Sequence, residues 1–140
     1  MATENSVAET FLYSSLNVAG LTALLTSPAT ITYAEASQAT TGTFVIFEQV
    51  SGIDHNVQDQ LRGGTEMRYI VSGVAENSRA MPGAVAAKID ELLHNKVSTA
   101  QTGYVVNCWR HGPYTWSGSK HGRNFRHEGG IYTIWVRSTS

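Results

Sequence analysis

Apolar residues in the first 26 positions recur at helical spacing. Val7, Phe11 and Leu12 fall on one side of a helix, since residues three and four apart share a face. Asn17 is a favourable N-cap residue, so a second, short helix is predicted from Val18 to Thr26. The chain is therefore expected to begin with two helices.

A third helix is predicted before position 95. Proline is favoured in the first turn of a helix, so this helix is expected to start between Arg79 and Pro82. Asn95 suits the position that ends it, because asparagine tolerates the left-handed conformation found there. The predicted apolar stripe consists of Met81, Val85, Ile89, Leu92 and Leu93.

β-Branched and aromatic residues mark the strands. A short strand is expected at 31–33, a longer one at 43–50, and its return strand at 66–74. Two more strands are predicted at 101–111 and 128–138. Side chains alternate between the faces of a strand. The residues that share one face of the return strand are Met67, Tyr69, Val71 and Gly73.

Without the short strand at 31–33, which is not counted in the main sheet, the elements follow in the order α-α-β-β-α-β-β. This order indicates an α+β fold with a four-stranded antiparallel, or mixed, sheet and helices packed on one face. Polar residues and glycines predict a long, mobile hairpin arm at 51–65. The length suits a single domain over residues 1–140.

The final strand is apolar on both faces over Gly129–Val136. A strand of this kind has to be covered twice. A chain of 140 residues can place one helical layer on a sheet and has little left for the other side. We therefore expect something outside the chain to cover the second face, which favours a subunit of an assembly over an enzyme.

Composition and charge narrow the function classes. An apolar content of 41% fits a globular domain, and a net charge of −1 argues against a dedicated nucleic-acid binder. No apolar run approaches about 18 residues, so no membrane span is expected. Residues 1–103 hold five Lys and Arg against ten Asp and Glu, whereas residues 104–140 hold five against Glu128 alone. Copies could attract one another head to tail, and such a contact gives a ring if it closes. The alternative is that these charges only solvate mixed faces.

Cys108, His111, His121 and His127 are residue types that bind zinc or act as a thiol–histidine pair. Their spacing lacks the close pairs of a structural zinc site. Cys108 also lies inside a predicted strand, where thiols are mostly inert. A metal-dependent or thiol enzyme therefore stays the weaker alternative, and no cofactor is expected.

The basic segment from Lys120 to His127 mixes cations with Phe125. Such a segment can contact phosphates and stack on bases, or it can pair with carboxylates of a neighbouring subunit. The second interpretation is favoured because the whole chain is not basic.

Four blocks of sequence form an ordered set. Phe44–Gly52 resembles a first core strand, Arg68–Ala75 its return strand, and Ala84–Leu93 an alanine-rich helix. The fourth block comprises Arg110, Pro113-Tyr114, Gly122-Arg123 and Phe125–Tyr132. Together the blocks resemble the tail terminator, or tail-completion, family of long-tailed bacteriophages. The resemblance extends over about residues 18–138 and depends on the ordered set, since no single motif is specific.

The resemblance implies a structural virion protein with an α+β fold that forms a hexameric ring. The ring would cap the head-proximal end of the tail tube, stop its polymerisation and present the surface that joins the head–tail connector. The implied partners are identical subunits, the major tail tube protein, the connector protein and the tape-measure protein, while the genome passes through the lumen. Assembly would take place in the host cytoplasm, without catalysis. The alternative within the same virion is a head–tail connector, or neck, ring.

The arm at 51–65 and the segment at 112–126 match family regions that contact neighbours or the tube. The predicted interface residues are Arg62, Arg110, Tyr114, Trp116, Lys120, Arg123, Arg126 and His127. Reversing the charge of Arg123 and Arg126 together is expected to leave the monomer folded and to weaken ring closure.

Overall fold

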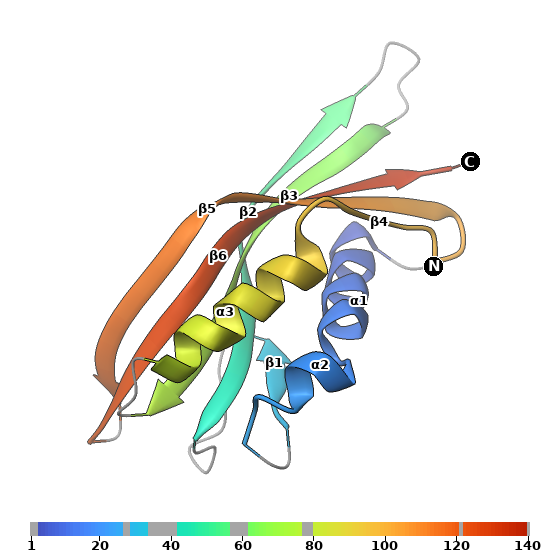
Figure 1. The fold of residues 1–140 in the computed structure, drawn as a ribbon. Coiled ribbons are helices and arrows are strands. Elements are labelled where there is room, and N and C mark those ends of the chain that lie inside the picture. Colours follow the sequence, from blue (N-terminus) through green and yellow to red (C-terminus); the bar gives the residue numbers. More distant parts are fainter. Residues whose placement is uncertain are drawn as a thin grey trace.

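A computed structural model describes residues 3–26, 29–33, 42–56, 62–76, 80–120 and 122–139, with only the backbone described at 55, 56, 62, 63, 80 and 120. Nine elements follow one another along these residues (Figure 1). They are α1 (Glu4–Leu16), α2 (Ala19–Thr22), β1 (Ile31–Tyr33), β2 (Thr43–Asn56), β3 (Arg62–Glu76), α3 (Ala80–Leu93), β4 (Lys96–Ser98), β5 (Tyr104–Lys120) and β6 (Arg123–Ser138).

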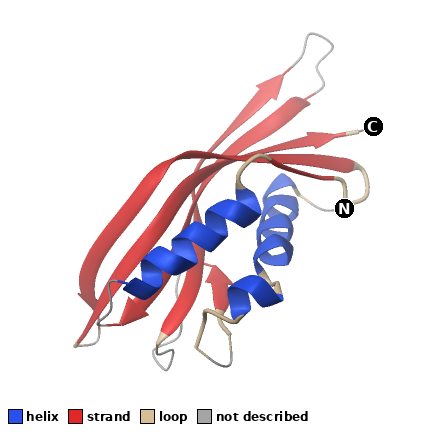
Figure 2. Ribbon diagram, in the orientation of Figure 1, coloured by secondary structure: helices blue, strands red, loops and turns tan. Residues whose placement is uncertain are grey.

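All the strands belong to one six-stranded sheet in the order β1-β2-β3-β6-β5-β4. β1 runs parallel to β2, and every other neighbouring pair is antiparallel. The sheet curls into a half-barrel, and the three helices lie on its concave side (Figure 2). The predicted fold class was therefore wrong, because the described structure is mostly sheet, has six strands instead of four, and includes β1 and β4, which the predicted order lacked.

The long strands account for most of this difference. β2 and β3 stay paired as far as Asn56 and Arg62, so the described part of the predicted arm is a two-stranded extension of the sheet; residues 57–61 lie outside the described residues. The predicted interface loop at 112–126 is also mostly strand. It pairs β5 with β6 in an unbroken register from Gly112 to Lys120.

The helices agree with the pattern in part. Asn17 caps the C-terminus of α1, and α2 spans only Ala19–Thr22, shorter than predicted. α3 starts at Ala80 and is followed by Asn95, whose φ of 57° confirms the predicted left-handed stop. Met81, predicted in the buried stripe, is 38% exposed. No described helix is both long enough and apolar enough to cross a membrane.

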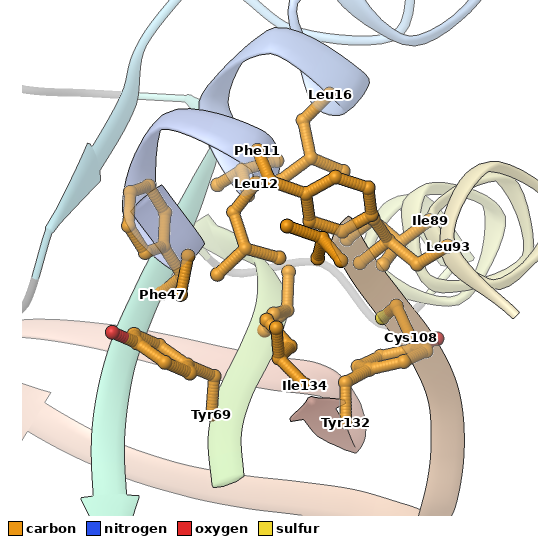
Figure 3. Packing of buried hydrophobic residues seen from close by; sticks show 14 of the residues in the cluster. Phe11, Leu12, Leu16, Phe47, Tyr69, Ile89, Leu93, Cys108, Tyr132 and Ile134 are labelled. Carbon is orange, nitrogen blue, oxygen red and sulfur yellow. The ribbon is translucent and has the colours of Figure 1, made fainter. Parts of the chain in front are cut away.

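The core fills the concave side of the sheet (Figure 3). α1 contributes Phe11, Leu12 and Leu16, and α3 contributes Ile89 and Leu93. The sheet residues that meet them are Val45, Phe47, Met67, Tyr69, Val71, Val106, Cys108, Tyr132, Ile134 and Val136. Met67, Tyr69, Val71 and Gly73 lie on this side, which confirms the predicted shared face of the return strand.

Two buried tyrosines of the sheet bond to helix carboxylates. The Tyr69 hydroxyl donates to Glu9 Oε2 of α1 at 3.3 Å, and the Tyr132 hydroxyl donates to Asp90 Oδ1 of α3 at 3.1 Å. A buried hydroxyl without a partner is costly, so these bonds complete the core as well as join its layers.

Small residues allow the sheet to curl closely around α3. A Cβ at Gly73 would stand 2.7 Å from Val85 Cβ of α3. A Cβ at Gly129 would stand 2.6 Å from Ser72 Cα in the neighbouring strand and would also overlap Val71 O. β5 carries a bulge between Arg110 and Gly112 beside this region, and bulges bend strands. The backbone itself thus sets the curvature.

We expect Gly129→Ala to lower the free energy of unfolding by about 1–3 kcal/mol, the usual range for overpacking. The added methyl group has only backbone to displace. Gly112→Ala is the matched control, since no atom lies within 4 Å of a Cβ built there. Urea unfolding measures both variants, and equal midpoints would contradict this account of the curl.

Candidate assembly surface

The face of the sheet away from the helices, called here the outer face, has no described helix or strand over it (Figure 2). The final strand, β6, shows how the two faces of the sheet differ in burial. Tyr132, Ile134 and Val136 point to the core and are at most 1% exposed. On the outer face of the same strand Ile131 and Trp135 are half-buried, whereas Thr133 is 2% exposed. The chain thus covers one apolar face of β6 with helices and leaves the other face partly open.

One row of outer-face residues crosses the sheet from edge to edge. The cross-strand pairs run Ile53–Glu66–Trp135–Asn107–Val97. The two ends of the row are the most exposed large apolar residues among those described, with Ile53 at 56% and Val97 at 65%. A hollow of about 400 Å³ adjoins Val97 and is bounded by Trp109 and Trp135. Sequence reasoning missed Val97, although an apolar residue between Lys96 and Ser98 is a weak strand signal.

The opposite end of the outer face forms a small core of its own. The rings of Phe44 and Phe125 lie edge to face with 6.2 Å between their centres. The rings of Trp116 and His127 pack in the same manner with 4.9 Å between their centres. Two apolar residues of this end, Phe44 and Val74, are 4% and 1% exposed. Trp116 keeps 49% of its surface exposed and is the one predicted interface aromatic that stands out from this cluster.

Two predicted interface cations have partners in their own chain. Arg123 lies 3.8 Å from Glu76 and places its guanidinium 5.0 Å from the centre of the Phe125 ring. Arg126 lies 3.4 Å from Glu128 and also donates to Ser117 Oγ at 3.3 Å. These contacts largely neutralise both charges, so Arg123 and Arg126 are less suited to hold a neighbour's acids than the sequence indicates.

Two of the remaining predicted residues border one groove. Arg110, exposed on the helix side of β5, and Tyr114 both line a groove of about 340 Å³ together with Asp90 of α3. Tyr114 is half-buried, and burial, followed by the charge of Glu48, raises the pKa of its hydroxyl. The backbone places Arg62 in the arm and Lys120 at the end of β5, and their side chains lie outside the described part of the structure.

The cysteine and histidines of the alternative site are also separated. Cys108 faces the core at 1% exposure, His127 lies on the outer face against Trp116, and His111 is exposed. His121 lies outside the described residues. Within the described residues no three His, Cys, Asp or Glu side chains come together as metal ligands do.

No protein-family model and no curated protein matches this sequence. Among solved structures, a chain of the virion of a native gene transfer agent (GTA) particle has the same fold. The TM-score is 0.65 at 18% identity, over 91% of this chain and 92% of the virion chain. At this identity the likeness establishes the fold.

Cys108 is expected to resist thiol reagents in the native protein. Burial raises the pKa of its thiol to about 12, so the reactive thiolate is scarce near neutral pH. The urea-unfolded protein should react rapidly and serves as the control. Fast labelling of the folded chain would revive the thiol-enzyme alternative.

Acidification is expected to weaken the cluster around His127. Burial lowers the pKa of this ring below its ordinary value of about 6.5, so the unfolded chain binds more protons than the folded chain. The free energy of unfolding should therefore fall as the pH drops from about 6.5 toward the pKa of His127 in the folded protein. Above about pH 6.5 the contribution of His127 should not change with pH.

Urea unfolding of wild type and His127→Gln at about pH 7.5 and about pH 5 measures this effect, because the carboxylates common to both proteins cancel in the comparison. His127→Gln should lose less stability on acidification than wild type does. His111→Gln removes an exposed ring and should behave like wild type. Identical pH slopes for all three proteins would show that His127 is not the group responsible.

Proposed function

We propose that this chain is a structural protein of a phage-like virion that forms a ring, caps the head-proximal end of the tail tube and ends tube polymerisation. Its partners would be further copies of itself, the major tail tube protein and the head–tail connector protein, with the tape-measure protein as a neighbour in the lumen. This role requires no catalysis and no cofactor.

The observation that carries the proposal is the likeness to a virion chain over nearly the full length of both proteins. The surface is consistent with it. The helices cover only the concave side, and exposed apolar side chains remain at two opposite edges of the sheet. A monomer with such edges risks unspecific pairing, whereas a subunit uses them for assembly.

Purified tail tubes of the parent virion provide the test. Added protein should bind at one end of each tube, appear there as a ring in electron micrographs, and prevent further addition of tube subunits. The isolated ring should have the mass of six chains. Binding along the tube wall, or continued growth after saturation, would contradict a capping role.

The same preparation separates the capping role from the neck-ring alternative. A tail terminator should bind tube ends in the absence of heads, whereas a neck ring should bind DNA-filled capsids and leave free tubes uncapped. A protein that bound neither would refute both forms of the proposal.

A further inference from the structure

We propose that neighbouring copies join by their sheet edges, with β4 of one copy pairing with the free part of β2 in the next. This joint rests on the proposed ring and specifies which surfaces meet in it. It would continue the sheet from copy to copy along the row that ends in Ile53 and Val97.

Both edges are open at the same level of the sheet. β1 covers β2 only at Val45–Phe47, so β2 has no described neighbour on that side from Glu48 to Asn56. At the other edge β4 pairs with β5 and with no other described strand. Ile53 and Val97 lie in one cross-strand row, which places the two open edges opposite each other across the sheet.

The strand directions allow a head-to-tail joint. β2, β3, β6, β5 and β4 alternate in direction from one neighbour to the next, so β4 runs in the same direction as β2. Copies that share one orientation would therefore bring β4 beside β2 as a parallel pair. A heterologous contact of this kind gives a ring if the rotation between copies closes, whereas a contact between two identical edges stops at a dimer.

The side chains that would meet at the joint have complementary chemistry. Val97 and Ile53, at 65% and 56% exposure, would become direct neighbours on the outer face, and each would remove apolar surface of the other from water. On the helix side Lys96 would lie beside Gly52, and Asp54 is the next residue of β2 on the same face, two positions along the strand and within reach of a lysine side chain. Lys96 and Asp54 are thus the one pair of opposite charges that the joint would bring together among the described residues.

The free lower part of β5 is the competing edge. It carries Pro113 and the bulge between Arg110 and Gly112, both of which discourage strand addition. Its exposed Trp116 packs on its own chain's His127. β4 is therefore the better partner for β2.

Variants that each carry one added cysteine test the joint directly. Ile53→Cys and Val97→Cys are mixed in equal amounts, at assembling concentration and on tail tubes, and treated with a short bis-maleimide. The mixture should give covalent dimers on a denaturing gel, and neither variant alone should give any. The double variant I53C/V97C should give a ladder that ends at the ring size. Wild type, with Cys108 buried, controls for the native thiol.

Each result has a definite meaning. Dimers from Ile53→Cys alone, or from Val97→Cys alone, would indicate contact between identical edges and overturn the joint. Rings on tube ends without any cross-link would also overturn it, while the proposed function stands. Absence of both rings and tube-end binding would overturn the joint and the proposed function together.

Charge substitutions provide the second readout. Val97→Lys or Ile53→Lys should raise the concentration needed for half-assembly by about tenfold or more, because the joint would bury an unpaired ammonium. Val18→Lys is the matched control, since Val18 is 37% exposed and lies between α1 and α2, outside both strands of the proposed joint. Unchanged urea midpoints show that all three variants fold. Equal assembly by the edge variants and the control would contradict the joint.

Discussion

The structure depends on one constraint: a curled sheet with two partly apolar faces has only enough helix to cover one of them. α1, α2 and α3 pack on the concave side, and the core residues there are almost fully buried. No described helix covers the outer face. At one end of this face the aromatic cluster around Phe44 buries apolar surface, and at the other end the row from Ile53 to Val97 stays open. Assembly is the natural use of an open end on an otherwise finished domain.

The sequence pattern predicted the parts of the fold whose side chains alternate clearly. The return strand and the stop at Asn95 fall in this class, because core packing and a left-handed residue both leave a local signature. The pattern did not predict the strands in the stretch at 112–126, since glycine, serine and proline there are typical of loops. Pairing with β6 and the contact between Trp116 and His127 outweigh that local preference. Reading this hairpin as a loop and missing β4 led to the wrong fold class.

The candidate surface was less predictable because it depends on register. Arg126 and Glu128 are two residues apart in a strand, so they share a face and can pair, and this was readable from the sequence once the strand was known. The partnership of Arg123 with Glu76 needs the alignment of β3 with β6, which no local pattern gives. Val97 belongs to a strand of three residues, too short for any periodicity to show.

The two tyrosine–carboxylate bonds have a consequence for how the helices can move. An α-helix advances about 5.4 Å per turn, so sliding α1 or α3 along its groove by one turn would carry Glu9 or Asp90 out of reach of its hydroxyl. The apolar contacts alone would tolerate such a slide, because leucine and isoleucine pack against many neighbours. The two hydrogen bonds thus fix the position of each helix along its own axis. A block fixed in this way can be added to an assembly without being reshaped by it.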